Sequence, residues 1–470
     1  MKNEKYLSNI IRLMRFNEKE INYLKSKGGA DYINCAVISS GCKLNRFESS
    51  QLEVLFKRLN NLDININMME GLPSAVKNSG LDENIGLFLV NTCTVTEKAE
   101  TETNRIIRKI RRKYPDGMII LTGCSAQLNK NKFSEMNNIK LIDNVQKTEL
   151  LKISAEKFPD AILRQKRTRP YLKIQEGCEL NCAYCIIPKA RPVKWSMDAK
   201  NILDIIKKLG ESGYKEVILT GVNLGSYTDK NSKTKLKNLL AGIEELKSNV
   251  RIRLSSIDPV YIDDETVKIF ASSKKIRNHF HIPLQSASDK ILKSMNRNYN
   301  FRDYALTIEK ISEAVKDVSI GTDIISGFPG ETYEDFAETE DRLKILPLHY
   351  IHAFSYSDRP GTKSYAFKQK IGETEIKRRT NIIRNISEQK KIEFHKKFQN
   401  KTLEFLALND NKAISSNYIK AKIIADSIVE AGTPFTGKIK EIPETFSDGS
   451  QNKAPTGNAE IGVEIDALIV

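Results

Sequence analysis

Short apolar runs alternate with amphipathic stretches along the first third of the chain. The runs occupy residues 33–39, 85–91 and 118–122, and helical periodicity fills residues 46–60 and 96–114. Apolar runs of strand length that alternate with helical patterns predict a parallel β-sheet covered by helices. We place this first unit at residues 31–160. It follows a Lys- and Asn-rich leader, residues 1–30, which we expect to be flexible with at most one helix.

The same alternation repeats in the middle of the chain. Six apolar runs occupy residues 171–175, 216–220, 251–255, 279–284, 318–325 and 350–355. Helical patterns lie between them, and a charged helix is predicted over residues 378–398. Six strand–helix units with strands this short predict a partial barrel or a long open α/β sheet, which we place at residues 165–395.

The pattern changes again in residues 400–470. Strand-like pieces at residues 403–408, 419–424 and 437–439 are separated by turns that contain Gly and Pro. This pattern predicts a small β-barrel at the C-terminal end. We therefore expect an α/β protein of three units.

The net charge of the chain suggests what kind of partner it binds. The chain has 75 Lys and Arg against 59 Asp and Glu, a net charge of +16, which favours a polyanion such as nucleic acid. The alternative is a general lysine bias of the source. No apolar run reaches the ~18 residues of a membrane span. The first residues also lack the apolar core of a signal peptide, so we expect a cytoplasmic protein that does not bind membranes.

The spacing of the seven cysteines favours metal or catalytic roles over disulfides. Cys178, Cys182 and Cys185 follow the first strand of the middle unit, where active sites of such folds lie. Three thiolates can ligate three irons of a four-iron cluster and leave the fourth iron open. A structural zinc site is the alternative, but zinc normally takes four protein ligands.

Three further cysteines share one kind of position in the first unit. Cys42, Cys93 and Cys124 each come at the end of an apolar strand and open a polar turn. Neighbouring parallel strands would bring these three ends together as a second incomplete cluster site. Glycines directly before Cys42 and Cys124 allow close backbone approach there. The alternative is three inert buried cysteines. Cys35 lies inside a strand and is predicted to be a core residue.

The two cysteine sets, in this order, resemble the radical S-adenosylmethionine (SAM) methylthiotransferase family. The resemblance runs from residue 34 to about residue 395. It is carried by SSGCKLNRFES, VNTCTVTEKAE, LTGCSAQ, KIQEGCELNCAYCIIPKAR, LTGVNLGSY, RLSSIDP, HIPLQSASD, GTDIISGFPGET and FSYSDRPGT. The strings TGVNLGSY and CIIPKAR favour the bacterial branch that acts on threonylcarbamoyladenosine beside the tRNA anticodon. One departure is Pro192 after Arg191, where the family usually has Gly.

The resemblance implies a fold and a chemistry. The fold would be an N-terminal flavodoxin-like sheet, a partial (β/α)6 radical SAM barrel and a C-terminal TRAM β-barrel that grips RNA. The cofactors would be two [4Fe-4S] clusters and SAM. The cluster on Cys178, Cys182 and Cys185 would cleave SAM to a 5′-deoxyadenosyl radical, and the second cluster would supply sulfur that another SAM methylates. An electron donor such as flavodoxin or ferredoxin is also implied.

The resemblance further implies that the target is carbon 2 of N6-threonylcarbamoyladenosine in the tRNA anticodon loop. Alternatives within the family are isopentenyladenosine in tRNA and an aspartate of a ribosomal protein. An alternative of another class is a non-catalytic iron–sulfur protein that binds RNA or transfers electrons.

Polar residues and glycines at the predicted strand ends are candidates to bind SAM, and the alternative for each is a turn or cap. These candidates are Tyr184, Gly221, Asn223, Ser255, Gln285, Asp323 and Gly327. Tyr184 and Trp195 are alternatively candidates to stack on a base or to pack in the core. We expect His279 and His281 to pack. A basic helix end is a candidate RNA contact, or simply a solvated face; it contains Arg105, Arg108, Lys109, Arg111, Arg112 and Lys113.

Overall fold

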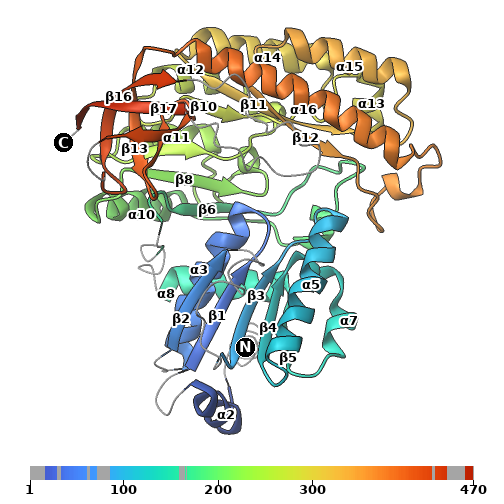
Figure 1. Ribbon diagram of the computed structural model, residues 1–470, viewed down its shortest axis with the longest axis vertical. Helices are drawn as coiled ribbons and strands as arrows, with labels where there is room; N and C mark the ends of the chain where they lie inside the picture. The colour runs from blue at the N-terminus through green and yellow to red at the C-terminus, as the bar shows by residue number, and fades with distance from the viewer. Residues whose placement is uncertain are drawn as a thin grey trace.

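The computed structural model describes residues 16–28, 33–60, 64–70, 85–157, 165, 167–425, 429–441 and 461–468. It consists of an N-terminal α/β unit, a larger α/β core and a C-terminal β-barrel (Figure 1). In Figure 1 the N-terminal unit lies below the core, and the barrel lies beside one end of the core. The α/β class and the three kinds of architecture expected from the sequence are confirmed.

The N-terminal unit is a parallel sheet with strand order β2-β1-β3-β4-β5, the order of flavodoxin-like folds. Its strands are β1 (Ile33–Ser39), β2 (Ile64–Glu70), β3 (Leu87–Thr92), β4 (Met118–Gly123) and β5 (Ile139–Ile142). Its helices are α2 (Glu18–Gly28), α3 (Lys43–Asn60), α5 (Glu97–Lys113), α6 (Cys124–Leu128), α7 (Lys130–Ser134) and α8 (Asn144–Lys157). The strands β2 and β5 were not anticipated from the sequence.

Alternating side chains of the central strands build two cores, one on each face of this sheet. Val37 and Leu89 pack with α2, α3 and α8, whereas Ile38 and Val90 pack with α5, α6 and α7. Cys35 is a buried member of the first core, as predicted.

Part of the expected N-terminal leader is a helix that packs on the sheet. Residues 16–28 include α2, in which Leu24 is fully buried, and Phe16 just before it is buried as well. Both side chains belong to the first of the two cores. Residues 1–15 and 29–30 of the predicted leader lie outside the described residues.

The core contains all six strands predicted for the middle of the chain. They are β6 (Tyr171–Glu176), β8 (Glu216–Gly221), β9 (Arg251–Leu254), β10 (His279–His281), β11 (Ser319–Ser326) and β12 (Tyr350–Ser355). They form parallel ladders β6-β8-β9 and β10-β11-β12, and a bridge from Ile252 to Ile276 connects the two halves. The short β7 (Trp195–Ser196) pairs antiparallel with β6. The sequence predicted β10 to continue to residue 284, but Pro283 offers no N–H to a ladder.

Helices cover the outside of this curved sheet, in keeping with a partial barrel. They are α10 (Ala199–Glu211), α11 (Leu236–Glu244), α12 (Asp264–Ser272), α13 (Asp289–Ser294), α14 (Phe301–Ala314), α15 (Tyr333–Ile345) and α16 (Glu373–Lys396), whereas the short α9 (Ile187–Ala190) contacts α6 of the N-terminal unit. Short 3-10 turns are η2 (Leu224–Ser226), η3 (Pro259–Tyr261) and η4 (Ser364–Ala366). A single large apolar cluster joins the strands to these helices.

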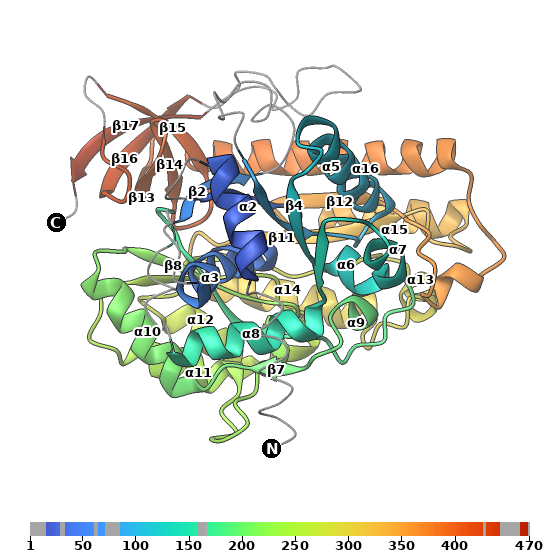
Figure 2. The ribbon, with the colours of Figure 1, turned by 90° about the horizontal axis from the view of Figure 1, so that it is seen from below.

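The C-terminal unit is a closed five-stranded barrel with strand order β13-β14-β15-β17-β16. Its strands are β13 (Thr402–Leu408), β14 (Lys412–Ser415), β15 (Lys420–Ile424), β16 (Pro434–Glu441) and β17 (Ile461–Leu468). Seen from below, the N-terminal unit lies across the core, and the barrel flanks both of them (Figure 2). Among the helices that the structure describes, none combines the length and hydrophobicity needed to cross a membrane.

Candidate active site

The sheet order brings three cysteines of the N-terminal unit to one edge. Cys93 and Cys124 come directly after β3 and β4, and Cys42 comes shortly after β1. These three strands are neighbours and run parallel, so their carboxyl ends lie side by side. Cys42 is exposed, whereas Cys93 and Cys124 are buried.

Two glycines with positive φ make this approach possible. A Cβ atom on Gly41 (φ +93°) would lie 2.5 Å from the Cβ and 2.8 Å from the Sγ of Cys93. A Cβ atom on Gly123 (φ +100°) would lie 2.3 Å from the carbonyl oxygen of Thr92. Any larger residue at either place would push the cysteine turns apart.

The second set of cysteines lies in one loop after β6, and the core fixes that loop from several sides. The N–H of Ala183 donates to the carbonyl of Met295 at 2.8 Å, and its carbonyl accepts from the N–H of Ser364 at 2.9 Å. The Nη1 of Arg297 lies 3.1 Å from the Sγ of Cys182, and the same guanidinium pairs with Asp258.

Sulfur spacing argues against a single zinc ion at either set. Around one tetrahedral zinc with bonds of about 2.3 Å, thiolate sulfurs lie about 3.8 Å apart. Among the described residues, the only three ligand groups within 4.8 Å of one another are His281, Asp323 and His352. Neither cysteine trio meets that spacing, so the donor sets fit a larger group of metal ions better than a single ion.

Burial keeps free thiols protonated at both sites. Burial raises the pKa of Cys93 to about 11, and the nearby Arg191 opposes the rise. Burial likewise raises the pKa of Cys185 to about 12. Metal binding requires thiolates, so occupation of either site would release protons and couple cluster binding to pH.

One amide connects the two cysteine sets. The Nδ2 of Asn144, at the start of α8, donates to the carbonyl of Ala190 at 2.6 Å and lies 3.7 Å from the Sγ of Cys124. Ala190 ends α9, which begins two residues after Cys185. A buried side chain therefore joins the strand-end site to the helix that directly follows the loop site.

A buried ion network ties the N-terminal unit to the core beside the strand-end cysteines. Arg191 donates to Glu48 at 2.8 Å and to Glu176 at 2.9 Å. Glu48 also pairs with Lys147 at 2.6 Å and with Lys173 at 2.7 Å. All five side chains are at most 2% exposed. Although burial opposes it, the three cations hold the pKa of Glu48 well below its usual range.

This network has more positive than negative charge. Three cations face two carboxylates, and Arg191 is an electrostatic neighbour of Cys42 and Cys124. Excess positive charge favours an anionic set of thiolates next to it. A second connection, from Arg359 to Thr94 at 2.7 Å, joins the segment after β12 to the turn that carries Cys93.

The residues proposed to bind SAM have different surroundings. Asn223 lies beside the loop, because its Nδ2 is 3.8 Å from the Sγ of Cys178. Gly221 lies against Gln175, where a Cβ atom would be 2.8 Å from the Oε1. The Oγ of Ser255 is buried and has no hydrogen-bond partner among the described residues, which suits a group that receives a ligand. Tyr184 lies within the loop and packs against Phe328 and its neighbours.

The other three candidates lie on the β10–β12 side. Gln285 has φ +74° and bridges to β11, since its N–H donates to the carbonyl of Asp323 at 2.8 Å. Gly327 packs on α16, where a Cβ atom would lie 2.4 Å from the Cγ1 of Ile376. The structure thus gives Gly327 a packing contact that the sequence did not suggest.

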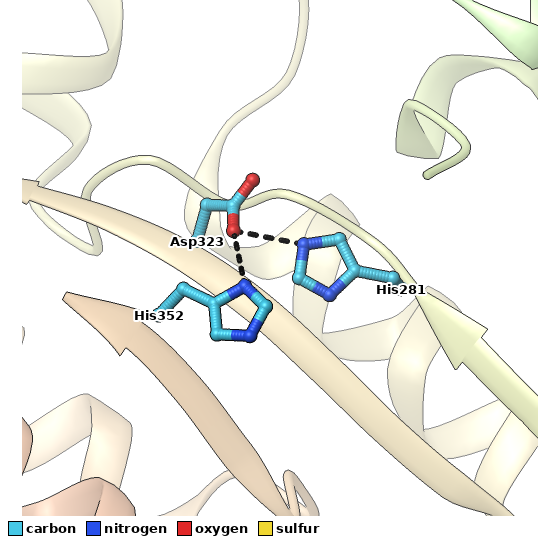
Figure 3. A group of neighbouring side chains, drawn as sticks. All are labelled: His281, Asp323 and His352. Carbon is cyan, nitrogen blue, oxygen red and sulfur yellow. Dashed lines mark hydrogen bonds and ion pairs between the residues drawn. The ribbon is translucent and has the colours of Figure 1, made fainter. Parts of the chain in front are cut away.

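Asp323 is engaged by two histidines from neighbouring strands (Figure 3). Its Oδ1 accepts from the Nε2 of His281 at 2.8 Å and from the Nδ1 of His352 at 3.2 Å. The hydroxyl of Tyr350 lies 2.8 Å from the Nε2 of His279 and 3.1 Å from the Nδ1 of His281. The packing predicted for His279 and His281 is confirmed, because both are buried and stack on Tyr350. The two histidines also belong to a continuous hydrogen-bonded chain, which the sequence did not suggest.

Sequence reasoning missed several residues that surround the cysteines. Arg191, Glu48, Asn144 and Arg297 were not singled out for the site, because their partners are far apart in the sequence. Only Lys173 could have been noticed in the sequence, because a charged residue inside the apolar run of the first core strand must pair with a buried partner.

The basic end of α5 lies about 15 Å along the helix from its contact with Cys93. In the middle of α5 the hydroxyl of Thr103 donates to the carbonyl of Cys93 at 3.2 Å, and ten residues of the helix follow Thr103. Its basic residues Arg111, Arg112 and Lys113 lie in the last turn. Trp195, the other candidate, is partly buried against the apolar core.

Fold and site together define a radical SAM enzyme with an additional cysteine-bearing unit at its N-terminus. Residues 172–343 match the Radical SAM superfamily, and residues 34–143 match the Uncharacterized protein family UPF0004. A solved radical SAM methyltransferase, TsrM from Kitasatospora setae, has a TM-score of 0.49 at 14% identity over 70% of this chain and 76% of that chain.

Relatives narrow the class to a family. A protein of Aquifex aeolicus named threonylcarbamoyladenosine tRNA methylthiotransferase MtaB is 35% identical over 81% of this chain and 94% of that protein. One of the same name from Rickettsia prowazekii is 35% identical over 87% and 96%. The tRNA-2-methylthio-N(6)-dimethylallyladenosine synthase of Endomicrobium trichonymphae is 32% identical over 83% and 91%. The chain belongs to the radical SAM methylthiotransferase family, whose superfamily uses SAM and a [4Fe-4S] cluster.

Proposed function

We propose that this enzyme methylthiolates carbon 2 of N6-threonylcarbamoyladenosine in the anticodon loop of tRNA. The observation that carries the proposal is the presence of two cysteine trios, one on each side of one domain interface. One trio alone suffices for SAM cleavage. A second trio, which Asn144 connects to the helix that follows the loop and which lies beside Arg191, has no use in SAM cleavage and suits sulfur insertion.

Each trio has the donors for a cluster with one open iron. Cys178, Cys182 and Cys185 would hold one [4Fe-4S] cluster, and Cys42, Cys93 and Cys124 would hold the other. When bound, these groups supply the electron that cleaves SAM and the sulfur that is transferred. Backbone N–H groups near the thiols and the two buried guanidinium groups of Arg191 and Arg297 suit anionic clusters.

The protein's own residues would orient SAM and the two cysteine sites relative to each other. Asn223 lies beside the loop and Ser255 lies at the end of β9, and both would bind polar groups of SAM. Arg297 would hold Cys182 in place through a charge-assisted contact. The buried network around Arg191 would fix the distance between the sites, since a small misplacement of reacting groups costs a large factor in rate.

The choice of base rests on the relatives. Those named for threonylcarbamoyladenosine reach 35% identity, and those named for dimethylallyladenosine reach 32%. This margin favours threonylcarbamoyladenosine and makes the isopentenyl base the second candidate. The net charge of +16 supports an RNA substrate over a protein one.

Mass spectrometry of tRNA nucleosides tests the proposal. A strain that lacks the gene should lose 2-methylthio-N6-threonylcarbamoyladenosine and accumulate the form without sulfur. The wild-type gene should restore the product, and a Cys178→Ala gene should not. Loss of the isopentenyl product instead would establish the second candidate. If both methylthio nucleosides persist in the deletion strain, a tRNA substrate is wrong.

A further inference from the structure

Three side chains that can bind a metal ion lie together on β10, β11 and β12 (Figure 3). They are His281 at the end of β10, Asp323 within β11 and His352 within β12. One ligand atom from each lies within 4.8 Å of the other two. The parallel register places Asp323 opposite His352, so the sheet itself fixes the distance between these two donors. Sites built on strands hold their geometry more precisely than sites on loops.

Asp323 differs from the buried carboxylates of the core in its partners. Glu216 pairs with Arg253 at 2.8 Å, and Glu331 pairs with Arg379 at 2.8 Å. Among the described residues, Asp323 forms no ion pair with a lysine or an arginine, and its two partners are histidines, which carry charge only when protonated. Its side chain is only 21% exposed, and a carboxylate shielded from water needs a paired cation or a metal ion. A metal ion between the two imidazoles would supply the positive charge that arginine supplies elsewhere.

The distances between the donor atoms are close to those of a small metal site. The Oδ1 of Asp323 lies 2.8 Å from the Nε2 of His281 and 3.2 Å from the Nδ1 of His352. Two ligands of one tetrahedral zinc ion, with bonds of about 2.0–2.1 Å, lie about 3.3 Å apart. The donors therefore need to separate by at most about half an ångström to receive an ion between them.

The surroundings of His281 orient its ring for this role. Its other nitrogen, Nδ1, lies 3.1 Å from the hydroxyl of Tyr350, and that hydroxyl lies 2.8 Å from the Nε2 of His279. Histidines that bind metal ions usually engage an outer partner through the second ring nitrogen, which fixes the ring and its tautomer. His281 is buried, whereas the side chain of His352 is 57% exposed. The group therefore has one rigid, buried side and one side that water or a ligand can reach.

We propose that His281, Asp323 and His352 bind one divalent transition metal ion, such as zinc, that is separate from the two cysteine sites. Two imidazoles and one carboxylate are a donor set of zinc and of mononuclear iron, and they leave coordination positions open for water or a ligand. Magnesium and calcium fit poorly because they prefer sets of oxygen ligands. The proposal goes beyond the proposed function, since it requires neither RNA nor sulfur transfer.

Zinc binding to the reconstituted full-length protein tests this site. The protein, with its clusters in place, would be dialysed without oxygen against dilute zinc chloride and then against metal-free buffer. Mass spectrometry would then measure zinc and iron per chain. The wild type should retain about one zinc ion per chain while its iron content stays unchanged. Magnesium chloride in the same protocol should leave no magnesium on the protein.

Calorimetric titration with zinc ranks the contributions of the side chains. His352→Ala and Asp323→Asn each remove a ligand and should weaken zinc binding more than about a hundredfold, whereas Tyr350→Phe removes only the outer partner of His281 and should weaken it about 10–100-fold. Phe354→Ala is the matched control and should bind zinc like the wild type, because Phe354 also lies on β12, is exposed and offers no ligand atom. Thermal unfolding without zinc would establish that each variant keeps its fold.

Three results would overturn the metal site. The wild-type protein might retain no zinc, it might retain zinc only as it loses iron, or His352→Ala might bind zinc as tightly as the wild type. If Asp323→Asn unfolds, His352→Ala decides alone, because its side chain is exposed. None of these results bears on the proposed function. Persistence of both methylthio nucleosides in the deletion strain would overturn that function and leave the metal site standing.

Discussion

The two cysteine trios are built in opposite ways. Cys178, Cys182 and Cys185 lie in one loop, and a guanidinium from Arg297 supports them from within the core. Cys42, Cys93 and Cys124 come from three separate turns, and their closeness depends on the strand order of a sheet. The loop trio can form wherever its loop folds, whereas the strand-end trio requires an intact N-terminal unit.

Their relation to the rest of the molecule also differs. The strand-end trio lies at an interface between units, beside the buried network of Glu48, Lys147, Lys173, Glu176 and Arg191. The loop trio contacts mainly the core. Damage to the interface should therefore affect the strand-end trio before the loop trio.

The largest expected effect is on the buried network. Glu48→Gln would leave three buried cations facing one carboxylate, and the loss of one partner in such a group costs about 3–5 kcal/mol. We expect the free energy of unfolding, from guanidinium denaturation of the full chain, to fall by that amount. Asp204→Asn, which breaks an exposed pair with Lys200, should change it by less than about 1 kcal/mol. Equal effects of the two substitutions would show that the network does not hold the units together.

A smaller effect is expected at the strand-end glycines. Gly123→Ala would force a Cβ atom to within 2.3 Å of the Thr92 carbonyl at a φ of +100°, which costs more than the ~1–3 kcal/mol of backbone strain alone. The iron content of the reconstituted protein should fall from about eight toward about four per chain. Gly213→Ala shares the positive φ but has nothing within 4 Å, so it should lose stability without losing iron. An unchanged iron content in Gly123→Ala would contradict this account.

The next largest effect is expected for Arg297, whose guanidinium lies beside the cysteine loop. Arg297→Gln should slow SAM cleavage about tenfold, which corresponds to about 1.4 kcal/mol in the barrier. The substitution would remove the charge-assisted hydrogen bond to Cys182 and leave the strand-end site untouched. The rate of 5′-deoxyadenosine formation would be measured with dithionite as reductant, and Arg297→Lys should recover part of it. A rate equal to that of the wild type would remove Arg297 from the site.

The smallest effect is expected at the basic end of α5. This end lies about 15 Å along the helix from the contact between Thr103 and Cys93, which exceeds the screening length of ~8 Å at physiological salt. Arg112→Gln/Lys113→Gln should therefore change RNA affinity less than twofold. Fluorescence anisotropy with a synthetic anticodon stem-loop RNA measures it. A tenfold loss would instead mean that the RNA crosses this face of the N-terminal unit.

Much of the fold could be predicted from the sequence, because apolar periodicity reports directly on strands and helices. The run at residues 33–39 corresponds to β1 residue for residue, and all six core strands were located. The strand β5 was missed because its sequence, Ile-Lys-Leu-Ile, is short and its side chains are mostly half-buried. Part of the expected leader forms α2, since a charged helix needs only a few apolar residues such as Leu24 to pack.

Residues of the site that lie close together in the sequence could be predicted, whereas pairs from distant segments could not. The loop motif is visible in eight consecutive residues, and the strand-end cysteines are visible once strands are assigned. Partners that join distant segments, such as Arg191 with Glu48 or His352 with Asp323, carry no local pattern and require the tertiary structure.

The central claim is a division of labour between the two trios, and one comparison tests it most directly. Cys42→Ala and Cys178→Ala would be reconstituted, and 5′-deoxyadenosine and methylthio nucleoside would be measured in the same reaction with tRNA. The account predicts that Cys178→Ala forms neither product. It predicts that Cys42→Ala still forms 5′-deoxyadenosine but no methylthio nucleoside. A Cys42→Ala enzyme that makes the methylthio product, or that loses SAM cleavage while its loop cluster remains intact, would contradict the account.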